Sequence, residues 1–234
     1  MDLTVVLVLA LGAALVIVVA VLAYRREQAR HAALQAWAVA GGWQLVDGND
    51  RWVEVFGGTP FGVGSARRAE DVCTRSRDGQ TEVAFTYRYA TYRTVPGVNG
   101  APPRREREEH SYRVVAIALP VPIGPVQVVV AGFGERVVTA LGGQDVEIEH
   151  AEFNRRHRVT AADAKLATDL LSPRVVEQLL AYSDVRLRLH DGWALAWDQG
   201  QLSGPSVDAR LAMLRAVVDG VPRFVWLDHG HDPG

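Results

Sequence analysis

The chain opens with an apolar run and continues with residues that alternate between apolar and polar. From residue 3 to residue 23 it reads LTVVLVLALGAALVIVVAVLA, with Thr4 as the one polar side chain. At about 1.5 Å of rise per residue, a helix of this length crosses the roughly 30 Å hydrocarbon core of a bilayer. A buried core helix, the alternative, is normally shorter and amphipathic. We therefore expect a transmembrane anchor over residues 1–23, embedded in the lipid bilayer through residues 3–23.

A cleaved signal peptide is the second alternative for this run. Such a peptide has a basic start, an apolar stretch of roughly 7–15 residues and a cleavage site of small residues. Here only Asp2 and the amino terminus precede a longer stretch, which ends in Tyr24-Arg25-Arg26. The pattern favours a retained anchor.

The charges beside the run predict its orientation. Arg25, Arg26 and Arg30 follow it, whereas no basic side chain precedes it. Positive charge beside a membrane span is enriched on the cytoplasmic side. The sequence therefore predicts a single-pass protein of the cell membrane with a cytoplasmic globular domain. The same three membrane-proximal arginines are placed to meet anionic lipid headgroups.

Residues 24–42 are expected to continue the helix as a juxtamembrane stalk. The segment is rich in alanine and has no proline or glycine before Gly41-Gly42. Leu34, Trp37 and Ala38 fall on one apolar stripe. We expect the stalk to dock on the globular domain through Trp37.

Alternation with a period of two predicts strands in the first half of the globular domain, which we assign to residues 43–227. Asp78-Gly79 is typical of a hairpin turn, and residues 57–64 read as a glycine-rich turn. Residues 93–109, rich in glycine, proline and charge, predict a long mobile loop. The expected strands are 43–46, 66–77, 83–89, 111–119 and 126–131.

Helical periodicity and capping residues dominate the second half. Thr160 and Ser172-Pro173 mark the starts of two consecutive helices. A further helix is expected from Ser206 to Gly220, then a closing strand at 223–227 and a flexible tail at 228–234.

The hairpin between residues 185 and 198 has two possible registers. A two-residue turn at Asp191-Gly192 mixes Arg188 into the apolar face. A three-residue loop over 190–192 sets Leu189 opposite Trp193 and gathers the apolar side chains on one face, with the arginines on a solvated face. We predict the three-residue loop.

These elements predict an α+β fold. An N-terminal transmembrane helix continues into a stalk helix, and one mostly antiparallel β-sheet domain follows, with two consecutive helices, a hairpin and a further helix.

Several short motifs resemble a known group of proteins. They are PFG at 60–62, VAFTYRY at 83–89, EFNRRHRV at 152–159 and LLSPRVVEQLL at 170–180. The order of these motifs after an N-terminal anchor resembles uncharacterised single-pass membrane proteins of high-GC Gram-positive bacteria that carry a domain of unknown function. The resemblance implies the architecture and brings no activity or site residues.

The net charge and the single cysteine exclude some classes of function. The net charge is −2 and the pI is near 6.4, so no basic field attracts nucleic acid. Cys73 is the one cysteine, which excludes a disulfide within the chain and a four-cysteine zinc site.

Two groups of residues are candidate sites. His229, His231 and Asp232 supply donors for a partial metal site, although a flexible polar tail is the alternative. Arg155, Arg156 and His157 surround Phe153 and form a candidate patch for an anionic ligand; the alternative is a strand edge with solvated charges.

No motif assigns catalytic or cofactor-binding residues, and no cofactor is expected. Residues 57–64 lack the lysine of a P-loop, and neither G-x-S-x-G nor H-E-x-x-H occurs. We therefore expect a non-catalytic interaction or ligand-binding module with a protein partner still to be identified. The alternative is a membrane-associated enzyme, which a deep pocket holding His150, His157 and carboxylates would indicate.

Overall fold

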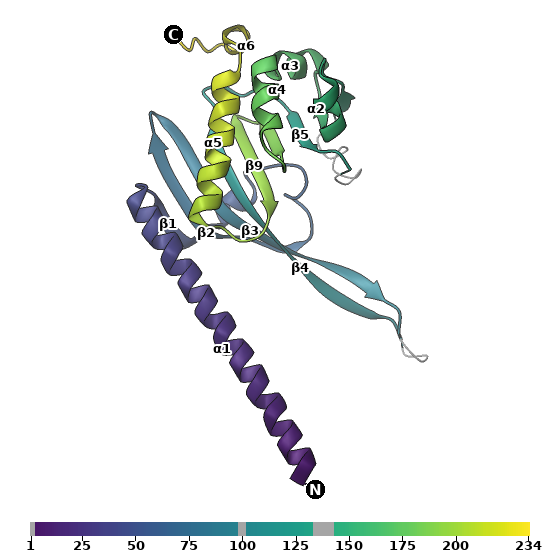
Figure 1. The fold of residues 1–234 in the computed structure, drawn as a ribbon. Coiled ribbons are helices and arrows are strands. Elements are labelled where there is room, and N and C mark those ends of the chain that lie inside the picture. Colours follow the sequence, from purple (N-terminus) through teal and green to yellow (C-terminus); the bar gives the residue numbers. More distant parts are fainter. Residues whose placement is uncertain (1–2, 98–101, 133–142) are drawn as a thin grey trace.

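The protein is described by a computed structural model over residues 3–97, 102–132 and 143–234, with side chains from residue 11 onward. It is an α+β fold built on one antiparallel sheet of nine strands, in the order β1-β2-β3-β4-β9-β8-β5-β7-β6 (Figure 1). The strands are β1 (Gln44–Gly48), β2 (Ser65–Arg77), β3 (Gln80–Val95), β4 (Arg104–Ala118), β5 (Val126–Val130), β6 (Gln144–Val146), β7 (His157–Ala161), β8 (Arg186–His190) and β9 (Trp193–Gln199).

Helices pack on one face of this sheet, where they form the larger of two hydrophobic cores. This core joins one face of the central strands to side chains such as Leu34, Val175 and Leu214, each of which is buried. The helices are α1 (Leu3–Ala40), α2 (Ala151–Arg156), α3 (Ala164–Leu170), α4 (Pro173–Leu180), α5 (Gly204–Gly220) and α6 (Arg223–Asp228).

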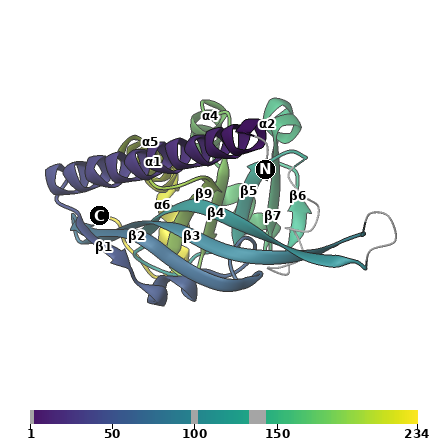
Figure 2. The same cartoon turned by 90° about the horizontal axis from the view of Figure 1, so that it is seen from below.

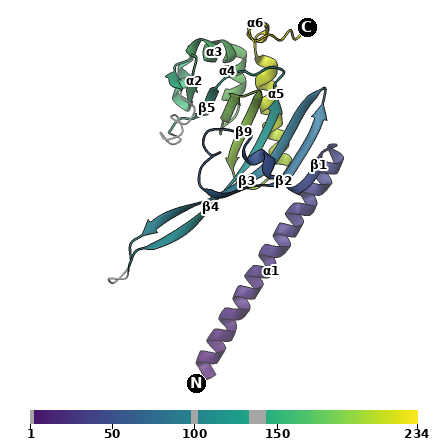
Figure 3. The same ribbon diagram turned by 180° about the vertical axis from the view of Figure 1, so that it is seen from behind.

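The opposite face is covered by an irregular segment instead of helices. Residues 50–64, which include the short 3-10 helix η1 (Asp50–Val53), lie across the sheet and bury a second, aromatic core (Figure 3). Trp52 and Phe56 from this segment pack against Phe85 at ring-centroid distances of 6.4 and 6.0 Å. Both faces of the central strands are therefore dry.

The helix α1 is continuous from the apolar run into the stalk and docks only by its last turns. Leu34 and Ala38 are buried, and the indole N–H of Trp37 donates to the Asp208 carboxylate at 3.0 Å. The expected docking through Trp37 is confirmed. Among the residues whose side chains the structure describes, no helix is both long and apolar enough to cross a membrane.

The expected loop at 93–109 is wrong in its extent. Strand pairing between β3 and β4 continues to Val95 opposite Arg104, so most of this charged segment is a two-stranded ribbon. We call residues 91–95 with 104–109 the arm. It projects from the domain, and it leaves on the same side as the N-terminal end of α1 in every view (Figures 1, 2 and 3).

The register predicted for the β8–β9 hairpin is also wrong. Leu189 lies opposite Ala194, and the two-residue turn holds Asp191 and Gly192 at φ values of 48° and 78°. The prediction assumed one apolar face and one solvated face. Because both faces are covered, Arg188 lies opposite Leu195 in the aromatic core, and Asp198 lies on the other face.

Three further elements differ from the sequence prediction. Residues 223–227 form helix α6 and not a strand, and residues 151–156 form helix α2. Helix α3 begins after its cap Asp163, while Thr160 belongs to β7. In each case a short apolar pattern fits a helix and a strand equally well, and packing decides between them.

Candidate functional site

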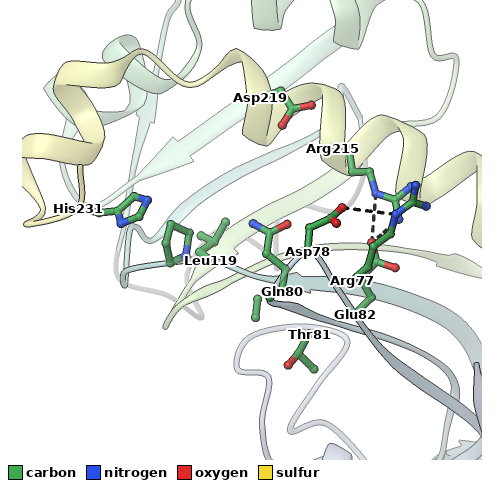
Figure 4. A pocket seen from close by; sticks show the side chains of 12 residues that line it. Arg77, Asp78, Gln80, Thr81, Glu82, Leu119, Arg215, Asp219 and His231 are labelled. Carbon is green, nitrogen blue, oxygen red and sulfur yellow. Dashed lines mark hydrogen bonds and ion pairs between the residues drawn. The ribbon is translucent and has the colours of Figure 1, made fainter. Parts of the chain in front are cut away.

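One of the clefts beside the sheet lies at the end of the domain away from the N-terminus of α1. This distal cleft, of about 640 Å³, opens between the β2–β3 turn, the end of β4 and the C-terminal half of α5 (Figure 4). A smaller hollow of about 340 Å³ shares some of its walls on the α6 side. The lining of the distal cleft includes Arg77, Asp78, Glu82, Arg215, Asp219 and His231.

Glu82 is the buried acid of the distal cleft, and its two carboxylate oxygens are already engaged. Arg75 Nε lies 2.6 Å from Oε2, and the Arg215 guanidinium donates to Oε1. The Arg75 guanidinium also lies 4.2 Å from the centroid of the Trp43 ring. These contacts tie β2, β3 and α5 together, so Glu82 forms a structural ion pair with the two arginines.

The remaining polar groups of the distal cleft lie apart from one another. His231 faces the edge of Trp226 at the α6 end, whereas Arg77 pairs with its neighbour Asp78 at 3.6 Å at the other end (Figure 4). Nothing in this arrangement pairs a nucleophile with a base.

A second cleft, of about 740 Å³, lies where α1 meets β1 and β2; we call it the stalk cleft. Arg30 Nη1 lies 2.9 Å from the Asp71 carboxylate and donates to the Leu202 carbonyl at 3.1 Å. His31 Nε2 lies 3.4 Å from Asp47. The ion pair with Arg30 lowers the pKa of Glu27, and the bonds to Glu27 and Asp71 raise the pKa of Arg30. This network fixes the stalk to the sheet.

The three membrane-proximal arginines therefore have different environments. Arg25 and Arg26 are exposed, whereas Arg30 is half-buried in the docking contacts of the stalk. The sequence did not distinguish them, because the difference depends on Asp71, which is distant along the chain.

The candidate metal donors in the tail are not brought together. His229 bonds the Val225 carbonyl through Nδ1 at 2.8 Å, and Asp232 pairs with Arg223 at 2.7 Å, while His231 packs on Trp226. No group of three or more histidine, cysteine or acidic side chains that could hold a metal ion occurs in the described part of the chain.

The residues of the candidate anion patch also point in different directions. Arg155 is exposed, Arg156 donates to the carbonyls of Leu180 and Tyr182, and His157 is buried with its ring 4.7 Å from that of Phe153. Burial, with a smaller contribution from Arg156, lowers the pKa of His157.

His150 does not join His157 in a pocket. Its Nδ1 accepts the backbone N–H of Phe153 at 3.1 Å and caps α2, and its Nε2 lies 3.6 Å from Glu177. The histidine cluster that would indicate an enzyme is therefore not formed by these two residues.

Arg188 is the buried group that sequence reasoning placed wrongly. It is fully buried over the Trp197 ring, at 4.6 Å from the centroid, and donates to Gln127 and to the carbonyls of Gly57, Gly58 and Thr59. These acceptors are neutral, and burial lowers the pKa of Arg188 to about 10. The arginine holds the irregular segment 50–64 on the sheet. The sequence predicted a turn at residues 57–64. It did not indicate that Arg188 donates to the carbonyls of this turn.

The fold defines the class of this protein as an α+β domain on a nine-stranded antiparallel sheet with a long N-terminal helix. It is similar to the crystal structure of the mycobacterial trehalose monomycolate transport factor A, TtfA, with a TM-score of 0.61 and 13% identity over 81% of this chain and 92% of that chain. At this identity the similarity establishes the fold alone. No protein-family model and no curated protein matches the chain.

Proposed function

We propose that this chain is a membrane-anchored protein whose globular domain acts as a non-catalytic interaction or ligand-binding module on the cytoplasmic face of the cell membrane. The observation that carries the proposal is the N-terminal half of α1. Over residues 11–22, where the structure describes them, its apolar side chains are exposed on all sides of the helix, for example Leu15 at 65% and Val16 at 68%.

An apolar helix surface without a protein cover is unstable in water. Each Å² of exposed apolar area costs about 25 cal/mol, and a helix that is apolar all round is normally buried or spans a membrane. In the sequence the same apolar run begins at Leu3, ahead of the residues whose side chains the structure describes. A bilayer is the cover of matching length.

Two further observations support a binding role for the domain. The acid in the distal cleft is neutralised by two arginines, which leaves a polar surface and no activated group. The structural neighbour is described as a transport factor, a role that does not require catalysis. The cytoplasmic orientation rests on Arg25 and Arg26, which follow the apolar run and stay exposed.

Fractionation and protease protection test the anchor and the orientation separately. The full chain should stay in the membrane pellet after washing with alkaline carbonate and should be released by detergent. Protease added to intact spheroplasts should leave the domain whole, and permeabilised spheroplasts should lose it. Release by carbonate would contradict the anchor, whereas digestion in intact spheroplasts would contradict the orientation only.

A further inference from the structure

The arm extends toward the same plane as the end of the apolar run of α1. Arg88, just before the arm in β3, lies beside the stalk cleft, because its Nε is 2.6 Å from Glu70 and Glu70 lines that cleft together with Glu27. Only three residues separate Glu27 from Tyr24, or about 5 Å along a helix. Seven residues separate Arg88 from Val95, or about 23 Å along a strand.

The direction of the arm determines where its outer end lies relative to α1. The arm and the N-terminal end of α1 leave the domain on the same side in all three views (Figures 1, 2 and 3). The arm starts near the level of Glu27 and is several times longer than the distance from Glu27 to Tyr24, so it is long enough for its outer end to reach the level of Tyr24 and Arg25. If α1 is anchored in a bilayer, that level is the membrane surface.

Charge is distributed unevenly along the arm. Arg93, Arg104 and Arg105 lie at its outer end, while Glu108, Glu109 and Arg107, which pairs with Glu109 at 3.0 Å, lie nearer the domain and together carry one net negative charge. The one acid at the outer end, Glu106, is shared between Arg93 at 2.9 Å and Arg104 at 3.1 Å. The outer end is therefore net positive and the inner part is acidic. This polarity suits an anionic surface that is approached by the outer end first.

The arm also carries an exposed aromatic ring beside one of these arginines. Tyr92 is 52% exposed, and the Arg105 guanidinium lies 5.0 Å from its ring centroid. Tyr92 is four residues from Arg88 along β3, so both side chains lie on the face of the sheet that carries α1. Tyrosine and arginine side by side are typical of the headgroup region of membranes, where the ring meets apolar chains and the guanidinium meets phosphate.

We propose that the arm is a second membrane contact, in which Arg93, Arg104 and Arg105 bind the phosphate groups of anionic lipids. This inference rests on the proposed anchoring of α1. With α1 and the arm both attached, the domain has a fixed orientation on the membrane, and the distal cleft opens away from the bilayer toward a soluble ligand or partner.

A site-specific fluorophore on the full chain tests this contact. Val95→Cys, labelled with an environment-sensitive dye, is reconstituted into vesicles of phosphatidylcholine alone or mixed with phosphatidylglycerol, and quenching by spin-labelled lipid is measured. Cys73 should not compete for the dye, because it is fully buried and burial raises the pKa of its thiol to about 12. We expect strong quenching at position 95 in the anionic vesicles, reduced by high salt.

Matched variants distinguish a specific contact through the arm from an effect of the net charge of the protein. Replacing Arg93, Arg104 and Arg105 by glutamine should weaken the contact about fivefold for each arginine. Replacing the exposed Arg77, Arg155 and Arg174 by glutamine changes the net charge equally and should leave the quenching at position 95 intact. Thermal unfolding of both triple variants checks that they remain folded.

Two reference labels make the outcomes distinct. Leu15→Cys reports insertion of α1, and Glu177→Cys, on α4 with a side chain 73% exposed, reports the far side of the domain. Quenching at position 15 but not at position 95 would overturn the arm contact and leave the anchor standing. No quenching at position 15 would overturn the proposed function itself. Equal quenching at positions 95 and 177 would overturn the arm contact in favour of non-specific adsorption.

Discussion

The two halves of α1 show the reverse of the usual relation between apolar character and burial. The N-terminal half is almost wholly apolar, yet Leu15 is 65% exposed. The C-terminal half carries charged and polar side chains, yet Leu34 is only 1% exposed and Arg30 is half-buried against Asp71. One continuous helix thus packs against the domain where it is polar, while the described side chains of its apolar half, from residue 11 onward, are exposed.

This difference indicates that the two halves are adapted to different surroundings. The C-terminal half is held by specific contacts, namely the Arg30 ion pair, the Trp37 bond to Asp208 and the buried Leu34. The N-terminal half has no pattern of faces that a single protein groove could cover. If one half belongs to the domain and the other to the bilayer, substitutions in the two halves should affect different properties.

Removal of residues 1–23 should have the largest effect on this comparison. We expect complete transfer of the protein from the membrane pellet to the supernatant, with a domain whose free energy of unfolding changes by less than about 1 kcal/mol. Ultracentrifugation and tryptophan fluorescence measure both, since all six tryptophans lie after residue 36. An insoluble or unfolded product would show that the N-terminal half also stabilises the domain.

Truncation of one leucine in each half should separate stability from anchoring. Leu34→Ala removes a buried side chain from the helical core and should lower the free energy of unfolding by about 2–5 kcal/mol. Leu15→Ala, the matched control, should change it by less than about 0.5 kcal/mol. Thermal unfolding of the full chain in lipid nanodiscs compares the two. Equal effects would remove the distinction between the halves.

Alanine substitutions at two glycines, Gly204 and Gly12, give a second test of the docking of the stalk on the domain. A Cβ on Gly204 of α5 would lie 2.3 Å from Cγ of Trp37, whose ring is held by Trp43 and Asp208. Gly204→Ala should therefore destabilise the docked stalk by about 1–3 kcal/mol, although alanine favours helix more than glycine does.

Gly12→Ala is the control for the glycine test. No atom lies within 4 Å of the position its Cβ would take, so its stability should match that of the parent protein. Hydrogen exchange at residues 34–40, measured on the full chain in nanodiscs, reports the docking of the stalk. Unchanged protection in Gly204→Ala would mean that the stalk is held without this close approach.

The smallest expected effect concerns pH, and it should be independent of α1. Burial lowers the pKa of His157, so below the ordinary value of about 6.5 the unfolded chain binds a proton that the folded chain resists. Stability should therefore fall as the pH drops below that value, by at most about 1.4 kcal/mol per pH unit. His157→Gln should reduce this slope equally in the full chain and in the protein without residues 1–23. If the pH dependence of stability differed between the two proteins, the effect of His157 would not be independent of α1.

Elements with strong local signals were predicted well. The Asp78-Gly79 turn, the start of α4 at Ser172-Pro173 and the continuous stalk are all present. Each depends on the backbone preferences of a few neighbouring residues. The register of β8–β9 and the nature of residues 223–227 were predicted wrongly, because both depend on which distant segment covers the element.

The clefts were not predictable for the same reason. Glu82 is paired by Arg75 and Arg215, and Arg30 by Asp71, across separations of 7, 133 and about 40 residues. A basic or acidic residue in a sequence does not reveal such a partner. The metal and anion candidates show the converse, since residues that are neighbours along the chain have different surroundings in the folded structure.

The sequence by itself determined the apolar run, the long helix that contains it, the alternating strands and the charges beside the run, because each depends only on the order of neighbouring residues. The tertiary structure alone decided that both faces of the central strands are covered, that Arg188 is a buried donor to segment 50–64, and that residues 91–95 pair with 104–109 in a projecting arm. These outcomes depend on contacts between segments distant in the chain. Such contacts exist only after the backbone has folded and its buried polar groups have found partners.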